Sequence, residues 1–237
     1  MTHTRFDIAS YLSVLPLFGE LAPDLLERVA HAGCGLERLE RGAMLFAAGE
    51  RCEAFHMVLT GHLKIYAIAD SGAEKVFELA GPGQPIGELC MFNAGQQRLN
   101  AQALTSALLL RIPRAAVMEL ILHQPAFALR MLAGASQRVQ GLQRDLESCC
   151  LHSGLRRVVG YLLEHHATAS SRSPRPGPIT VSLPVSKAAI AARLSLTPEY
   201  FSRVLRELED AGLINVARRD IHIPDTQRLA HYSRIAA

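Results

Sequence analysis

Short hydrophobic runs separated by glycine turns dominate the first half of the chain. After residues 6–32, where the apolar spacing indicates helix, the strand-like runs are residues 43–46, 55–59, 63–68, 75–79 and 101–110. An Asp-Ser-Gly turn at residues 70–72 lies between two of these runs and is a hairpin signal. Many short strands joined by glycine turns indicate a β-roll or small barrel over about residues 35–111.

From about Arg114 the hydrophobic spacing becomes helical, and one long helix is predicted from Pro125 to Ser148. Apolar or small residues recur on one stripe of this helix at heptad a and d positions: Leu132, Ala135, Val139, Leu142, Leu146 and Cys149. The far side is polar, with Gln137, Arg138, Gln140, Arg144 and Asp145. A narrow apolar stripe of this kind favours a helix that pairs with a second copy of itself. The alternative is a helix packed on its own barrel.

Two short helices with a tight connector are predicted near the C-terminus. Ser186 is a suitable N-cap for a helix over residues 187–194, and Thr197 caps a second helix that starts at Pro198. The second helix runs to about Ala211, where Gly212 can supply the left-handed residue that ends it. A short β-hairpin over residues 213–223, with the basic turn 217–220, follows. This arrangement is a winged helix-turn-helix, a DNA-binding motif.

The second of these helices presents a polar face made of Glu199, Ser202, Arg203 and Arg206. An arginine can donate two hydrogen bonds to guanine O6 and N7, a glutamate can accept from cytosine N4, and a serine suits either role. Phosphate contacts, which position a protein on DNA without reading its sequence, are assigned to Lys187, Thr197, Arg206, Arg218 and Arg219. Taken one by one, these residues also fit a solvated helix face, and Glu199 fits the positive end of the helix dipole.

Charge and composition agree with a DNA-binding C-terminal part. The 237 residues carry a net charge of +3, but residues 1–150 carry −2 and residues 151–237 carry +5. A basic segment suggests a polyanionic partner. The five cysteines include no CxxC pair, no apolar run is long enough to span a membrane, and the N-terminus lacks a secretory signal, so a cytoplasmic protein is expected. No Ser/His/Asp set with motif context, HExxH or P-loop indicates an enzyme.

Five segments, spread over nearly the full chain, resemble the Crp/Fnr superfamily of transcription regulators. They are residues 49–50, 61–65, 81–83, 86–89 and 185–214. The resemblance implies an α+β fold: N-terminal helices and a cyclic-nucleotide-binding-type β-roll over 1–124, a dimerisation helix and hinge over 125–152, and a winged helix-turn-helix over 153–237. It further implies a homodimer on palindromic promoter DNA, with RNA polymerase as a partner. In Fnr-type members a TTGAT-like half-site is read at the positions of Glu199, Ser202 and Arg203.

The segment from Gly87 to Arg98 resembles the phosphate-binding cassette of cyclic-nucleotide domains. The resemblance places Glu88 at the ribose hydroxyl and Arg98 at the cyclic phosphate. Two departures are clear: Leu99 stands where the family has a small hydroxyl residue, and Leu142 and Gln143 stand at the adenine-contacting positions. The complete predicted effector-binding set is Gly87, Glu88, Leu89, Arg98, Leu99, Leu142 and Gln143.

Haem is the alternative cofactor, with nitric oxide or another gas as the effector. Residues 198–203 and 101–104 also resemble the nitric-oxide-responsive, dissimilatory nitrate respiration branch of the family. The candidate iron ligands are His3, His56, His62, His123 and Cys90. A different class of function is a cyclic-nucleotide-binding signalling module that does not bind DNA. A separate hypothesis is that the neighbouring residues Cys149 and Cys150 form a redox switch.

Overall fold

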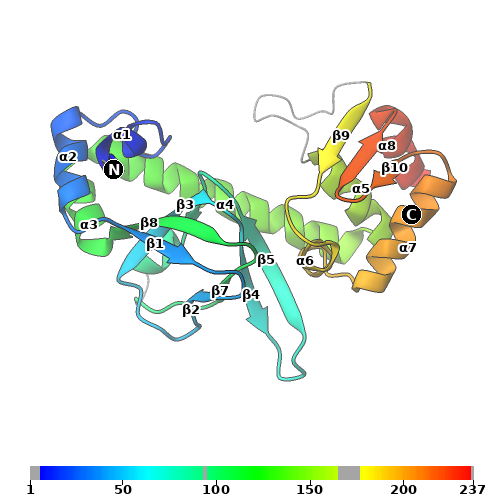
Figure 1. The fold of residues 1–237 in the computed structure, drawn as a ribbon, viewed down its shortest axis with the longest axis horizontal. Helices are drawn as coiled ribbons and strands as arrows, with labels where there is room; N and C mark the ends of the chain where they lie inside the picture. Colours follow the sequence, from blue (N-terminus) through cyan, green and yellow to red (C-terminus); the bar gives the residue numbers. More distant parts are fainter. Residues whose placement is uncertain (1–5, 93–94, 165–176, 236–237) are drawn as a thin grey trace, which may run out of the picture. The chain divides into compact units, whose positions relative to one another are not determined.

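The computed structural model describes residues 6–92, 95–164 and 177–235, and it has the mixed helix and strand architecture expected from the sequence (Figure 1). The chain divides into two compact units. The first contains the chain up to Tyr66 and from Glu78 to Gly141, and the second contains residues 67–77 and everything from Leu142 onward. The division therefore falls inside the long helix.

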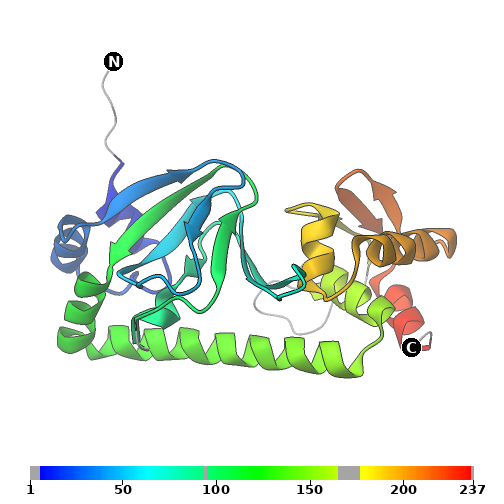
Figure 2. The ribbon, with the colours of Figure 1, turned by 90° about the horizontal axis from the view of Figure 1, so that it is seen from below.

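The helices of the first unit pack around one hydrophobic core. They are α1 (Ile8–Ser13), α2 (Pro23–His31), α3 (Arg114–His123) and the first turns of α4 (Pro125–Leu151). Phe18 and Phe127 meet in this core with ring centroids 5.4 Å apart, beside buried Phe55 and Ile112 from the strands. Figure 2 shows these helices at one end of the strands, with α4 running beside them. The helical pattern predicted over residues 6–32 is confirmed as α1 and α2.

The strands form two four-stranded antiparallel sheets, which make the predicted β-roll. One sheet has the order β1 (Gly35–Leu39), β8 (Ala107–Pro113), β3 (Ala54–Thr60), β6 (Pro85–Ile86). The other has the order β2 (Met44–Phe46), β7 (Asn100–Ala103), β4 (Leu63–Ile68), β5 (Glu74–Ala80). Val58, Leu63, Ile65 and Leu109 belong to a second buried cluster, which both sheets contribute to.

One strand assignment from the sequence is wrong. The apolar run 101–110 is two strands, β7 and β8, which lie in different sheets. The turn between them packs on Gly61, where a Cβ would lie 2.5 Å from the carbonyl oxygen of Ser106. Gly61 has a φ of +83°, so both its conformation and this contact require glycine. A hydrophobic run cannot show that its two halves pair with different partners.

The long helix α4 is continuous over 27 residues and ends three residues beyond the predicted Ser148. Its predicted seam is largely uncovered: Leu132 and Leu146 are each 66% exposed, and Val139 and Leu142 are also exposed. Ala135 and Cys149 are half-buried. Among the described residues, no helix is both long and apolar enough to cross a membrane.

The second unit is a helical core covered by a small sheet. Its elements are α5 (Gly154–Glu164), β9 (Ile179–Ser182), α6 (Lys187–Arg193), α7 (Pro198–Asp210), β10 (Asn215–Ala217), β11 (Asp220–Ile223) and α8 (Thr226–Ile235). The predicted wing is present as β10 and β11, with β9 as a third strand that was not predicted. Most of the predicted connector over residues 168–178 lies outside the described residues.

Candidate nucleic-acid interface and effector pocket

The turn between α6 and α7 is fixed by the two caps that the sequence predicts. Ser186 Oγ accepts from the backbone N–H of Ala189 at 3.3 Å, and Thr197 Oγ1 accepts from that of Tyr200 at 3.2 Å. Between the helices, Ser195 adopts the left-handed region with a φ of 55°. Each cap satisfies an N–H group that a helix leaves unpaired at its start. The angle between α6 and α7 and the residue at which α7 begins are therefore determined by residues close to this turn.

Helix α7 has one buried and one exposed face. The buried face consists of Phe201, Val204, Leu205 and Leu208. The exposed face carries the predicted base-reading residues Glu199, Ser202 and Arg203, together with Arg206. The guanidinium of Arg203 lies over the ring of Tyr200, 4.8 Å from its centroid, which is a cation–π contact. The three predicted base-reading side chains thus share one accessible face on the first two turns.

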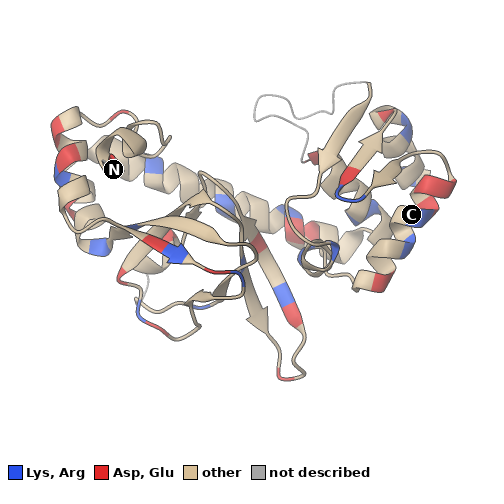
Figure 3. Cartoon of the chain, viewed as in Figure 1, with Lys and Arg blue, Asp and Glu red and all other residues tan. Residues whose placement is uncertain are grey.

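The wing places two further basic side chains in solvent. Arg218 and Arg219 are exposed at the turn between β10 and β11, where the ribbon in Figure 3 is blue for Lys or Arg, and Arg218 has a φ of 58°. The strand after this turn, β11, pairs with β9 along its length, and Ser182 Oγ also donates to Asp220 Oδ1 at 2.5 Å. Thr197 is exposed and Lys187 is half-buried. The exposed guanidinium groups at this turn are of the type that contacts the phosphates of a nucleic acid.

The predicted effector residues do not share one environment. Glu88 is buried at the start of a 3₁₀ helix, η1 (Glu88–Phe92), whereas Arg98 is exposed. Gln97, which the sequence did not single out, is buried, with its Nε2 3.3 Å from where a Cβ of Gly87 would lie. Leu99 packs against the core between the sheets. The other three predicted residues are Leu89, Leu142 and Gln143, all exposed.

Glu88 faces an arginine of the long helix. Arg138 Nη1 donates to Glu88 Oε1 at 3.1 Å, and Nη2 pairs with the carboxylate of Glu78 on β5. Burial raises the pKa of Glu88 to about 7 and lowers the pKa of Arg138. The second carboxylate oxygen of Glu88 is buried and has no hydrogen-bond partner among the described residues. The sequence showed Arg138 only as a polar position on α4, because no local pattern pairs it with residues 50 and 60 positions away.

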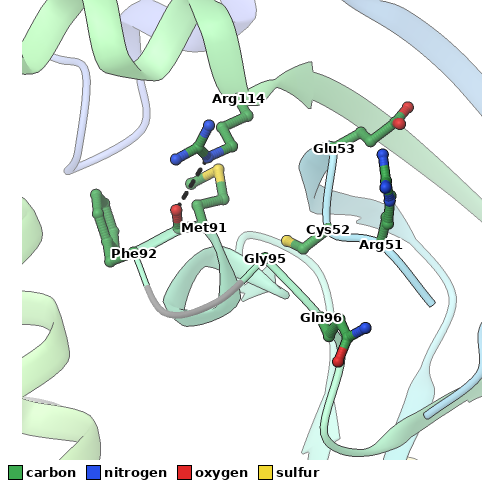
Figure 4. A pocket seen from close by; sticks show the side chains of 8 residues that line it. All are labelled: Arg51, Cys52, Glu53, Met91, Phe92, Gly95, Gln96 and Arg114. Atoms are coloured by element: carbon green, nitrogen blue, oxygen red, sulfur yellow. Dashed lines mark hydrogen bonds between the residues drawn. The ribbon is translucent and has the colours of Figure 1, made fainter. Parts of the chain in front are cut away.

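An open pocket of about 630 Å³ lies beside the same 3₁₀ helix and was not predicted (Figure 4). Its lining residues are Arg51, Cys52, Glu53, Met91, Phe92, Gly95, Gln96 and Arg114. Arg114 is oriented there by its Nε, which donates to the carbonyl oxygen of Met91 at 3.0 Å. Neither Glu88 nor Arg98 lines this pocket, so it is separate from the predicted effector set.

The candidate haem ligands are spread over several environments. His56 is buried, with Nε2 3.3 Å from Glu37 Oε2, and burial lowers its pKa. His62 is half-buried, and Cys90 Sγ donates to the carbonyl oxygen of Gln96 at 3.2 Å. His123 contacts the carbonyl oxygen of Glu119 at 2.9 Å, and His3 lies outside the described residues. Within the described ranges, no group of three or more His, Cys, Asp or Glu side chains is arranged to hold a metal ion.

Comparison with known proteins agrees with both halves of this description. Residues 36–124 match the cyclic nucleotide-binding domain, and residues 156–232 match the Crp-like helix-turn-helix domain. The "Probable transcriptional regulator flp" of Lacticaseibacillus casei is 26% identical, over 94% of this chain and 98% of that protein.

Two solved structures extend the comparison. FixK2 from Bradyrhizobium japonicum has a TM-score of 0.73 at 21% identity, covering 84% of this chain and 96% of that one. DNR from Pseudomonas aeruginosa is 32% identical, covering 94% and 96% of the two chains, with a TM-score of 0.49.

A β-roll of the cyclic-nucleotide-binding type followed by a capped, winged helix-turn-helix defines a DNA-binding transcription regulator. More particularly, the chain belongs to the Crp/Fnr family of these regulators.

Proposed function

We propose that this protein is a homodimeric regulator that reads a palindromic, TTGAT-like promoter site with α7. The observation that carries the proposal is the exposed row of Glu199, Ser202 and Arg203 at the start of a helix whose N-terminus is fixed by Thr197. Recognition helices read base edges with residues of their N-terminal turns. The residue types match guanine, cytosine and adaptable contacts, and Arg218 and Arg219 can add phosphate contacts.

Dimerisation through α4 is part of the same proposal. Leu132, Val139, Leu142 and Leu146 form an exposed apolar stripe at heptad spacing. Covering that stripe with the same stripe of a second copy removes it from water, which is the main driving force of association. Two-fold symmetry would then present two copies of α7 to two half-sites one helical turn apart.

Control by a small effector in the β-roll completes the proposal. Glu88, which belongs to the predicted cassette from Gly87 to Arg98, contacts Arg138 on α4. A ligand that binds one arrangement of roll and helix better than another shifts the population between them. The DNA-bound state would be favoured or disfavoured in this way. Because its partner is promoter DNA, we place the protein in the cytoplasm.

The test is DNA binding measured by fluorescence anisotropy on two duplexes of equal length. One carries two TTGAT half-sites in palindromic order, and the other has the same composition with both half-sites scrambled. We expect the palindrome to bind at least a hundredfold more tightly, with two chains per duplex in sedimentation analysis. Equal affinities would overturn the specific reading, and one chain per duplex would overturn the dimer. Arg234→Ala, an exposed arginine on α8, is the control for unspecific loss of charge.

A further inference from the structure

Two cysteines meet where the predicted cassette lies beside the start of β3. Cys52 precedes β3 and is only 4% exposed, and Cys90 lies in η1 and is half-buried. Their thiols are within hydrogen-bonding distance of each other. Cys52 Sγ lies 3.5 Å from the carbonyl oxygen of Gly87, and the backbone N–H of Cys90 donates to the same oxygen at 3.2 Å. One carbonyl group thus contacts both cysteines, although they are far apart in the sequence.

Backbone hydrogen bonds also hold together the two segments that carry these cysteines. Arg51 and Gln96 form an antiparallel bridge, and the N–H of Cys52 donates to the carbonyl oxygen of Gly95 at 2.6 Å. Cys90 Sγ donates to the carbonyl oxygen of Gln96 at 3.2 Å. Both sulfur atoms therefore lie at one short antiparallel ladder, and a bond between them would join segments that are already paired.

The open pocket beside η1 reaches this pair of thiols, because Cys52 forms part of its wall together with Arg114 (Figure 4). Burial raises the pKa of Cys52 to about 11, although the positive charge of Arg114 acts in the opposite direction. A thiol with so high a pKa stays protonated at neutral pH and reacts slowly with an oxidant, since the thiolate is the nucleophile. The half-buried Cys90 is therefore the thiol that reacts first, and Cys52 is the one that follows.

We infer that Cys52 and Cys90 are a dithiol site that hydrogen peroxide converts into an intramolecular disulfide, which joins the predicted cassette to the start of β3. The Cys90 thiolate attacks one oxygen of the peroxide, the O–O bond breaks, and a sulfenic acid and hydroxide form. Cys52 then loses its proton and attacks the Cys90 sulfur, the S–O bond breaks, and the second oxygen leaves as water. The hydroxide of the first step takes up the proton that Cys90 released, so two thiols and one peroxide give one disulfide and two waters.

This site differs from the other cysteines of the chain. Cys149 and Cys150, which the sequence suggested as a redox pair, lie on α4, and Cys34 Sγ donates to the carbonyl oxygen of Val29 at 3.2 Å. In the cytoplasm that we propose for this protein, a disulfide is formed transiently and responds to oxidants. The inference concerns the roll alone and does not depend on the DNA site proposed above.

Peptide mapping of the full-length protein after oxidation tests the inference. The reduced protein is treated with hydrogen peroxide, the remaining thiols are blocked with N-ethylmaleimide as the chain is unfolded in urea, and a non-reduced digest is analysed by mass spectrometry. We expect a disulfide between Cys52 and Cys90 of the same chain as the main product, with Cys34 recovered in its blocked form. Dithiothreitol should reverse the reaction.

Serine variants separate the steps of the reaction. Cys52→Ser should leave a sulfenic acid on Cys90, which dimedone captures, whereas Cys90→Ser should leave Cys52 reduced, because the attacking thiol is missing. The matched control is the double variant Cys149→Ser with Cys150→Ser, which should form the disulfide at the rate of the wild type. Circular dichroism verifies that each variant is folded.

Amide hydrogen exchange measures whether the disulfide fixes the cassette. The N–H groups of Cys52 and Gln97 donate across the ladder, so they exchange when the ladder opens. We expect both to exchange more slowly in the oxidised protein, by about tenfold or more, since the new bond opposes that opening. The N–H of Leu183, which donates to the carbonyl oxygen of Arg219 in the second unit, should exchange at an unchanged rate.

Three results would overturn the inference. The first is an oxidised wild type in which Cys52 and Cys90 stay reduced while other thiols react. The second is a bond between Cys52 and Cys90 that forms only when the protein is oxidised in urea. The third is a disulfide in the folded protein that leaves the exchange of Cys52 and Gln97 unchanged. None of these readouts involves DNA, so anisotropy of the reduced protein on the palindromic duplex shows separately whether the proposed function holds.

Discussion

The guanidinium of Arg203 lies over the ring of Tyr200, three residues earlier on α7, with 4.8 Å between the guanidinium carbon and the ring centroid. This contact restricts the rotamers of a long side chain that would otherwise be free in solvent. The position of the Tyr200 ring is restricted in turn, because the ring packs against the backbone of Gly154 at the start of α5. The orientation of Arg203, which reads a base in our proposal, therefore depends on a helix that does not contact DNA in that proposal.

We predict that Arg203→Ala weakens binding to the palindromic site by about 1–3 kcal/mol and relaxes specificity at one guanine in each half-site. The loss arises because alanine cannot make the bidentate contact to guanine O6 and N7. Affinities for a series of duplexes, each with one base pair changed, measure the effect position by position. Equal losses on every duplex would show that Arg203 contacts only phosphate.

Substitution of Gly154 should change DNA binding from a distance. An alanine Cβ there would lie 2.9 Å from the hydroxyl oxygen of Tyr200 and closer still to its ring carbons, so the ring must move. We predict that Gly154→Ala lowers the affinity for the palindromic site several-fold by releasing Arg203. Gly160→Ala is the matched control on the same helix, because a Cβ at Gly160 meets nothing within 4 Å. The control should stabilise the protein by about 0.5–1 kcal/mol and leave DNA affinity unchanged.

The DNA-reading half of the molecule could be predicted well because its signals are local. Ser186, Thr197 and Gly212 each determine a helix end from within a few residues, and the structure confirms all three. Strand β9 could not be predicted in the same way. Its four residues pair with β11 about 40 positions later, and a four-residue alternation has no meaning until that partner is known.

For the predicted effector site, much less could be predicted from the sequence. The resemblance located Glu88, and the structure buries it, but its partners come from β5 and α4. Arg138 looked like one more solvated position on the polar side of α4, and Asp145 on the same side also has a partner, Arg193 of α6, at 2.6 Å. Polarity along a helix shows which residues can be exposed. It does not show which of them are paired with a distant charge.

The buried carboxyl of Glu88 should make stability depend on pH. Its pKa rises from 4.5 to about 7 through burial, so between these values the unfolded chain releases the proton while the folded chain retains it. The free energy of unfolding should therefore fall as pH increases from about 4.5 to 7 and level off above that range. Arg138 from α4 contacts Glu88, and the other terminal nitrogen of Arg138 pairs with Glu78 from β5.

Urea denaturation at a series of pH values measures this slope. The useful quantity is the difference between the wild type and Glu88→Gln, because His56, whose pKa is lowered by burial, contributes in the opposite direction near pH 6.5 to both proteins. We expect the fall to be steeper in Arg138→Gln, where no guanidinium favours the ionised carboxylate. Parallel curves for the wild type and Glu88→Gln would contradict the raised pKa.

Leu142→Asp should break the proposed dimer. Leu142 lies at a d position in the middle of the exposed stripe of α4, and two symmetry-related carboxylates there would face each other in an apolar seam. We predict that sedimentation shows a monomer where the wild type is a dimer, and that binding to the palindrome weakens at least tenfold. A duplex with a single half-site, which engages one copy of α7, should bind the variant and the wild type with similar affinity.

Gln137→Asp provides the matched control for this substitution. It adds the same charge at an exposed position on the opposite side of the same helix, away from the stripe, so the dimer and its affinity for the palindrome should persist. If Leu142→Asp remains a dimer under these conditions, the two copies associate through another surface, and the exposed leucines of α4 need a different partner. If both variants dissociate, the effect comes from added negative charge on α4 and not from the seam.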